Sequence, residues 1–214
     1  MSPFTLLLGG ELTRTPRLDA QIANTRIIAA DAGMRHATTL GVVPELWVGD
    51  FDSAPSELMN SFSEVPRRRF PADKNETDGE LAMAIACKWG ATSLLLAGAF
   101  GGPRADHAFL HMTTATARVE EGIPSMLTSG AQEGTPLLPG RTGFDYGDGT
   151  LFSVIGFTAL SGLTLSGVKW PLEAIDLPFG SSLTISNVVV GHLTVELGRG
   201  RAFLIAHPYP QAGF

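Results

Sequence analysis

Short apolar segments alternate with helical stretches through the N-terminal part of the chain, and this alternation constrains the fold more than any other feature. The segments that read as strands are Phe4–Leu8, Arg26–Ala30, Leu46–Val48, Ser93–Ala97 and Ser125–Thr128. The stretches that read as helices are Arg17–Asn24, Gly33–Leu40, Pro55–Phe62, Thr77–Trp89 and Asp106–Glu121. Buried strands separated by helices predict a mostly parallel sheet with helices on its faces.

The pattern changes after this region. The segment Ala131–Gly149 is rich in Gly and Pro and has no periodicity, so we interpret it as a linker or crossover. Strand-like pieces then recur without a helix of ordinary length: Leu151–Phe157, Leu163–Leu165, Leu183–Ile185, Val188–Val190, Leu193–Leu197 and Ala202–Ala206. We therefore expect an α/β domain over residues 1–132 and an all-β domain, a sandwich or roll, over residues 133–214.

Composition narrows the classes of partner and compartment. The chain has 214 residues, 44% hydrophobic and 17% charged, which is typical of a globular protein. Its formal net charge of −6 argues against nucleic-acid or anionic-membrane partners. The single cysteine, Cys87, needs no oxidising compartment, and the N-terminal apolar stretch is too short to span a membrane and lacks the basic start of a signal peptide. We expect a cytoplasmic protein with one basic cluster, Arg67–Arg69, on a solvated strand or turn.

Acidic residues follow two of the predicted strands. Asp50 and Asp52, in the segment Gly49–Ser53, come directly after the third strand, and Asp31 comes directly after the second. Two carboxylates two residues apart can both reach one Mg²⁺ ion, although Asp52, Ser53 or Asp31 could equally cap a helix. Ligands of open α/β sheets bind beyond the carboxyl ends of the strands, so these residues should gather along one edge.

Two further segments combine charge with a helix start or a glycine-rich loop. The segment Lys74–Asp78 leads into a helix whose N-terminus favours anions, although Thr77 could simply be its cap. The segment Gly98–His107 is a glycine-rich loop that lets backbone amides approach phosphates. In it, Arg104 could clamp phosphate, and Asp106 could bind metal, accept a proton or cap the next helix.

The histidines are weak candidates for a metal site. His107 and His111 lie one helical turn apart, but without a third ligand nearby we expect packing or hydrogen bonding rather than zinc. No Ser-His-Asp or Cys-His order stands out. Acidic and glycine-rich strand ends without a nucleophile favour phosphoryl or pyrophosphoryl transfer, in which catalysis is mainly positioning and charge neutralisation.

These motifs, in this order and spacing, resemble thiamine pyrophosphokinases over nearly the whole chain. The resemblance is carried by Ala30–Gly33, Pro44–Ser53, Lys74–Asp78, Gly98–His107, Gly167–Leu172 and Ser186–Asn187. It implies an N-terminal α/β domain, a C-terminal β domain, and a homodimer in which both domains contribute to the thiamine site. It also implies Mg²⁺ and ATP, with the pyrophosphoryl group passing to thiamine and AMP released.

The resemblance implies a role for each matching residue. The metal ligands would be Asp31, Asp50, Asp52 and Asp78. The nucleotide site would contain Asp31, Lys74, Thr77, Gly101 and Arg104. The catalytic residues would be Asp78, Arg104 and Asp106. Arg104 would clamp phosphate, and Asp106 would orient the hydroxyl group of thiamine or act as its base. The thiamine site would contain Trp170 as an aromatic wall and a polar strand with Thr184, Ser186 and Asn187.

The chain departs from the family pattern at three positions, and other functions compete. Arg35, Pro103 and His111 are not the residues that the family usually carries there; Arg35 places a bulky cation near the nucleotide region. The competing interpretations are a non-catalytic sensor of ATP or thiamine, a pyrophosphokinase with another small acceptor, and a Mg²⁺ phosphohydrolase.

Overall fold

The structure, a computed structural model, describes residues 1–52, 54–71, 73 and 75–209. The chain divides after Gly130 into two compact units, Met1–Gly130 and the remainder from Ala131. Among the helices of the described residues, none is long and apolar enough to cross a membrane.

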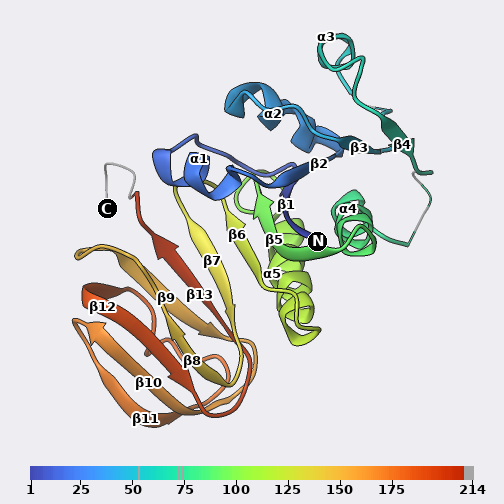
Figure 1. The fold of residues 1–214 in the computed structure, drawn as a ribbon. Helices are drawn as coiled ribbons and strands as arrows, with labels where there is room; N and C mark the ends of the chain where they lie inside the picture. The colour runs from blue at the N-terminus through green and yellow to red at the C-terminus, as the bar shows by residue number, and fades with distance from the viewer. Residues whose placement is uncertain (53, 72, 74, 210–214) are drawn as a thin grey trace. The chain divides into compact units, whose positions relative to one another are not determined.

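The first unit contains a sheet in which all described strand pairs are parallel (Figure 1). Its strands are β1 (Ser2–Leu7), β2 (Arg26–Ala30), β3 (Leu46–Gly49), β4 (Arg67–Arg69), β5 (Ala91–Ala97) and β6 (Ser125–Thr128). Within the unit they lie in the order β6-β5-β1-β2-β3-β4. The predicted parallel α/β layer is therefore confirmed, and the exposed arginine cluster forms its short strand β4.

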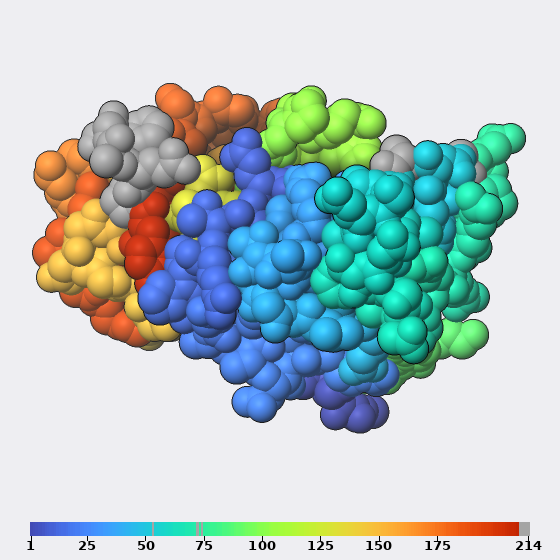
Figure 2. Space-filling view, turned by 90° about the horizontal axis from the view of Figure 1, so that it is seen from above, coloured from blue at the N-terminus to red at the C-terminus, as the bar shows by residue number. Residues whose placement is uncertain are grey.

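Helices join these strands. They are α1 (Pro16–Ile22), the 3-10 turn η1 (Asp31–Met34), α2 (Arg35–Leu40), α3 (Ser56–Ser61), α4 (Asp78–Lys88) and α5 (Ala105–Glu120). The predicted helix Gly33–Leu40 is thus split between η1 and α2. Helix α3 has no buried residue, and its cyan segment lies at the surface in the space-filling view (Figure 2).

The core of this unit follows from strand alternation. Leu7 pairs with Ala29 and Ala97, and all three belong to a cluster with buried residues of α1 and α2. Leu6 is in register with Ile28 and Leu96, so these fully buried residues point to the opposite face. Figure 1 shows α4 and α5 on the side away from α1 and α2. Burial on both faces explains why the strands read as continuous apolar runs.

The second unit is antiparallel throughout its described strand pairs. Its strands are β7 (Glu133–Leu137), β8 (Gly140–Gly143), β9 (Leu151–Gly156), β10 (Leu160–Val168), β11 (Leu172–Leu177), β12 (Asn187–Leu197) and β13 (Ala202–His207). The order is β7-β13-β9-β12-β10-β11, with β8 also paired to β12. The predicted C-terminal β region is confirmed.

Several predicted boundaries in this unit are wrong. The segment Ala131–Gly149 is not only a linker, because it contains β7 and β8. Pairing of β7 with the apolar strand β13 outweighs the low strand propensity of Gly134 and Pro136. The segment Leu183–Ile185 forms a turn rather than a strand, the two predicted strands that follow it are parts of β12, and β11 was not predicted.

Candidate active site

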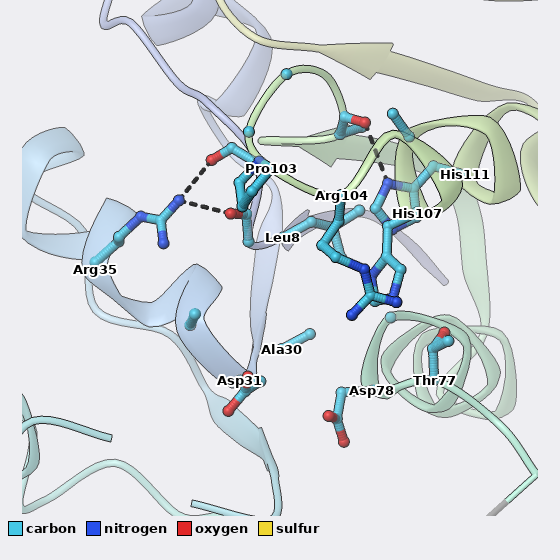
Figure 3. Close-up of a pocket in the computed structure, with 18 residues that line it drawn as sticks. Leu8, Ala30, Asp31, Arg35, Thr77, Asp78, Pro103, Arg104, His107 and His111 are labelled. Atoms are coloured by element: carbon cyan, nitrogen blue, oxygen red, sulfur yellow. Dashed lines mark hydrogen bonds between the residues drawn. The ribbon is translucent and has the colours of Figure 1, made fainter. Parts of the chain in front are cut away.

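A cavity of about 360 Å³ opens at the carboxyl ends of β1, β2 and β5, where the first unit also presents the N-terminus of α4 and the start of α5 (Figure 3). Its walls include Leu8, Gly9, Gly10, Ala30, Asp31, Arg35, Thr77, Asp78, Gly101, Gly102, Pro103, Arg104, His107 and His111. The strand-end rule therefore places a pocket where the sequence predicted one.

Glycines allow the strand ends to approach each other closely here. A Cβ atom on Gly33 would lie 2.1 Å from the carbonyl oxygen of Leu7, so η1 can rest on β1 only without a side chain. A Cβ on Gly10 would lie 2.4 Å from the carbonyl oxygen of Phe100. Gly10 N–H donates to Gly98 O (2.8 Å), which ties the loop after β1 to the loop after β5. These contacts leave backbone, rather than side chains, around part of the pocket.

Asp31 enters the pocket from the end of β2 in an unusual backbone conformation. Its φ is +43°, which an aspartate tolerates better than most residues. The indole Nε1–H of the fully buried Trp47 donates to the carbonyl oxygen of Asp31 (3.0 Å). A Cβ on Gly49 would lie 3.3 Å from the Cα of Asp31, so the end of β3 also packs against it. Neighbouring strands thus hold the backbone that carries this carboxylate.

Thr77 and Asp78 reach the pocket from the start of α4. Thr77 is the N-cap: its Oγ1 accepts from Glu80 N–H (3.2 Å), and Glu80 Oε2 accepts from Thr77 N–H (2.9 Å). This reciprocal capping box is the structural role that the sequence left open for Thr77. Asp78 follows as the first helical residue and lines the same cavity as Asp31 (Figure 3).

Arg104 and Asp106 form a bidentate ion pair at the start of α5, with Arg104 as the N-cap residue and Asp106 in the first turn. Arg104 Nε donates to Asp106 Oδ1 (3.0 Å) and Nη2 to Oδ2 (2.7 Å). The guanidinium group holds the pKa of Asp106 well below its usual range, and the carboxylate raises the pKa of Arg104. Arg104 lines the cavity, whereas the described lining does not include Asp106. The predicted pair is therefore brought together, with Arg104 as the member that faces the cavity.

The two histidines of α5 also line the cavity. Their rings meet edge to face at 6.3 Å between centroids. His111 Nδ1–H donates to the carbonyl oxygen of Ala99 (3.2 Å), which assigns its proton to Nδ1. Burial lowers the pKa of His111, so the ring is neutral at pH 7. These contacts agree with the expectation of packing and hydrogen bonding.

Asp50 and Asp52 lie in a second depression, which Arg69, Phe70 and Pro71 also line. Arg69 Nη2 bonds Asp52 Oδ1 (2.9 Å), and Arg69 Nε donates to the carbonyl oxygen of Asp50 (2.9 Å). Asp52 N–H donates to Asp50 Oδ1 (3.0 Å), which closes the turn.

The four predicted metal ligands therefore divide into two pairs: Asp31 and Asp78 line the first cavity, and Asp50 and Asp52 line the second depression. Within the described part of the chain, no group of three or more His, Cys, Asp or Glu residues has the arrangement of a metal site.

The thiamine candidates all lie in the second unit. Trp170, in the turn between β10 and β11, is 53% exposed. Asn187 is buried and holds the backbone of Trp170, because its Oδ1 accepts from Trp170 N–H (3.2 Å) and its Nδ2 donates to Trp170 O (2.9 Å). Thr184 is also buried, and its hydroxyl donates to Val154 O (2.6 Å). Ser186 is exposed at φ +61°.

The predicted polar strand is thus wrong for Thr184 and Ser186, which lie in the turn before β12. Asn187 is the first residue of that strand. Of the four residues, the structure brings Trp170 and Asn187 together through their hydrogen bonds.

Sequence reasoning missed some residues that shape the site. Glu11 was not predicted, although its carboxylate accepts from Gly102 N–H (3.3 Å) and supports the glycine-rich loop. Arg69 was predicted only as part of a solvated cluster. Its register opposite Gly49 in the parallel β3–β4 pair places it beside Asp50, and a run of three arginines gives no signal of that pairing. Lys74 lies outside the described residues.

Comparison with known proteins agrees with this arrangement. Residues 20–127 match the family model described as "Thiamin pyrophosphokinase, catalytic domain", and residues 144–201 match "Thiamin pyrophosphokinase, vitamin B1 binding domain". The thiamine pyrophosphokinase of Bacillus subtilis (strain 168) is 27% identical over 195 residues, which cover 89% of this chain and 91% of that protein.

Solved structures of the same family share the fold. The crystal structure of thiamine pyrophosphokinase from Bacillus subtilis aligns with a TM-score of 0.85 at 25% identity, covering 96% of this chain and 98% of that one. The thiamin pyrophosphokinase from Geobacillus thermodenitrificans aligns with a TM-score of 0.79 at 26% identity, covering 98% and 99%. Because the catalytic-domain model alone matches half of the chain, the chain belongs to the thiamine pyrophosphokinase family of enzymes.

Proposed function

We propose that this enzyme transfers the pyrophosphoryl group of Mg-ATP to the hydroxyethyl group of thiamine, giving thiamine pyrophosphate and AMP. The observation that carries the proposal is the first-unit pocket. It combines two glycine-rich strand ends, the carboxylates of Asp31 and Asp78, and the guanidinium group of Arg104, all within or beside the catalytic-domain match. Pyrophosphoryl transfer needs groups that position a polyphosphate and balance its charge, and this pocket provides both.

The residues of the pocket fit Mg²⁺ bound with a polyphosphate. Mg²⁺ is usually held by one or two protein carboxylates together with substrate phosphates and water, and Asp31 and Asp78 supply two such carboxylates in one cavity. In this proposal Asp50 and Asp52 contribute from the neighbouring depression, where Arg69 fixes their turn. A bound Mg²⁺ would supply neutralisation of the charge that develops on the phosphates.

Residues of the chain would bind the phosphates and the nucleotide and would orient the thiamine hydroxyl. Arg104 would bind phosphate oxygens, and its ion pair with Asp106 would fix the direction of the guanidinium group. Asp106 would accept a hydrogen bond from the thiamine hydroxyl and orient it. Gly101 would present its backbone to the nucleotide, Thr77 would hold the N-terminus of α4 beside the nucleotide through its capping box, and Lys74 would add a cation.

The acceptor would bind through the second unit. The half-exposed indole ring of Trp170 offers area for stacking against the flat rings of thiamine. Lys169 Nζ lies 4.5 Å from the centroid of this ring, so a cationic thiazolium would use the other face. Asn187 would act through its hold on Trp170, with Thr184 and Ser186 shaping the adjoining turn.

The assembly and compartment belong to the same proposal. We propose a homodimer in the cytoplasm, with residues 1–132 as the catalytic domain and residues 133–214 as the thiamine-binding and dimerisation domain. Exposed apolar side chains support a dimer contact in the second unit: Phe179 is 71% exposed, Leu183 64% and Val190 56%.

The test is product analysis of the purified protein with ATP, Mg²⁺ and thiamine, beside a control without thiamine. Thiamine-dependent AMP and thiamine pyrophosphate are expected in equal amounts. ATP binding without AMP would favour a sensor, and AMP formed only with another small acceptor would change the substrate. Release of ADP or free phosphate without thiamine would indicate a phosphohydrolase.

A further inference from the structure

Arg35 is a pocket residue for which neither the family resemblance nor the proposed mechanism supplies a role. It begins α2, and its side chain reaches back to the end of β1 (Figure 3). One terminal nitrogen, Nη2, donates to two carbonyl oxygens, those of Gly9 (2.6 Å) and Gly10 (2.8 Å). Arg35 makes no ion pair with any residue that the structure describes, so no carboxylate of that part of the chain neutralises it.

This arrangement changes the charge of the pocket wall. Carbonyl oxygens carry partial negative charge, and two of them at the end of a strand would repel a phosphate. The guanidinium group covers both with a single nitrogen. An arginine has five N–H donors, and no described residue accepts from Nε or Nη1 of Arg35. The side chain is therefore held in place by the backbone and still has donors for a ligand.

Arg35 and Arg104 lie on opposite sides of the cavity, with Asp31 and Asp78 at a third side in the view of Figure 3. Arg104 uses Nε and Nη2 for Asp106 and likewise keeps donors available. Two guanidinium groups that face one cavity suit an anion with several oxygens, since arginine recognises phosphate through its fork of N–H groups.

We propose that Arg35 is a phosphate-binding residue of this pocket and contacts the polyphosphate of the nucleotide from the side opposite Arg104. The proposal rests on the proposed function only in that the pocket takes a nucleoside triphosphate. Two other roles compete. In the first, which we call the structural latch, Arg35 only stabilises the loop after β1 through its hydrogen bonds to Gly9 and Gly10. In the second, its guanidinium plane stacks on the adenine ring. These roles predict different ligand dependences.

The test is the variant Arg35→Met, which keeps most of the apolar stem and removes the charge. Calorimetry would measure equilibrium binding of ATP and of inorganic tripolyphosphate, both with Mg²⁺ and without thiamine, and competition would measure adenosine. We expect ATP and tripolyphosphate to bind at least about tenfold more weakly, the loss of one charge-assisted contact, while adenosine binding stays unchanged. Arg35→Lys should recover part of the loss because it keeps the charge.

Arg14→Met is the matched control. Arg14 is also exposed and also donates to a backbone carbonyl oxygen, that of Thr39, but it pairs with Asp19 and does not line the cavity. This variant should bind all three ligands as the wild type does.

The outcomes separate the roles. An equal loss for all three ligands with a lowered melting temperature would establish the structural latch and overturn the proposal. A loss confined to ATP and adenosine would establish stacking, and unchanged binding of ATP would also overturn the proposal. Tight, Arg35-dependent ATP binding in a protein that forms no thiamine pyrophosphate would uphold this inference while refuting the proposed reaction. Absence of ATP binding by the wild type would refute both.

Discussion

Gly9 and Gly10 are adjacent residues in the loop after β1, and the structure predicts that the same substitution destabilises the protein at Gly10 but not at Gly9. A Cβ atom on Gly10 would lie 2.4 Å from the carbonyl oxygen of Phe100 and 2.5 Å from that of Gly98. A Cβ on Gly9 would meet only the Cβ of Ala32, at 3.7 Å, which is an ordinary contact. Neither glycine has a positive φ, so the comparison isolates space from backbone strain.

The cost at Gly10 can be worked from these contacts. To admit the methyl group of Gly10→Ala, the two carbonyl groups would have to retreat by about 1 Å, and overpacking of this kind costs about 1 to 3 kcal/mol. The same two oxygens accept hydrogen bonds from Gly10 N–H (2.8 Å) and Glu11 N–H (2.7 Å). Weakening both bonds adds about 0.5 to 1.5 kcal/mol each. We expect a total loss of about 2 to 6 kcal/mol in the free energy of unfolding.

Urea unfolding followed by tryptophan fluorescence would measure this loss, and peptide-resolved hydrogen exchange would assign it to the first unit. Gly9→Ala should stay within about 0.5 kcal/mol of the wild type. If Gly10→Ala were as stable as the wild type, the loops after β1 and β5 would not approach as closely as the structure shows. Equal destabilisation by both substitutions would show that the position of the methyl group does not determine the cost.

Two further predictions concern one residue in each unit. Burial lowers the pKa of His111 below its ordinary value of 6.5, so its contribution to stability should be complete above that value and decline as the pH falls toward the lowered pKa. His111→Asn should flatten the dependence of unfolding free energy on pH between about pH 7.5 and 5, and an unchanged slope would assign that dependence to other groups, such as the buried His36. Trp170→Ala should weaken thiamine binding by about tenfold or more, measured by calorimetry, because it removes the stacking surface. It should leave ATP binding unchanged, and equal losses for both ligands would instead show a structural role.

The strands of the first unit could be predicted where a buried apolar run is followed by a turn residue such as Asp, Ser or Gly. β2 and β6 have the predicted bounds, because both are buried runs with clear breaks after them. For β4 the sequence left a solvated strand and a turn open, because Arg67–Arg69 are exposed and carry no apolar pattern. Its existence depends on hydrogen bonding to β3, which is a tertiary property. β7 was missed because Gly134 and Pro136 have low strand propensity, and its existence likewise depends on pairing, in this case with β13.

The candidate site was predictable in part. The strand-end rule placed Asp31 and the glycine-rich loop along one edge of the sheet, and both line one cavity in the structure. Asp78, which the sequence suggested from its place at a helix N-terminus, lines the same cavity. The strand-end rule also placed Asp50 and Asp52 at the same edge, but β3 lies one strand farther from β1, and neighbouring strands are about 4.8 Å apart. That offset, together with the ion pair between Arg69 and Asp52 and the hydrogen bond from Arg69 to the carbonyl oxygen of Asp50, explains why these two carboxylates line a separate depression. Distances across a sheet cannot be read from the spacing of motifs along the chain.

Local charge, rather than the charge of the whole chain, determines which ligand suits the pocket. The chain carries a formal net charge of −6, which would disfavour an anion approaching a uniform surface. The cavity, however, places the guanidinium groups of Arg35 and Arg104 on opposite sides and the carboxylates of Asp31 and Asp78 at a third. A polyphosphate with a bound divalent cation also carries both signs of charge. Separation of charge within the cavity therefore favours such a ligand over either a free anion or a free cation.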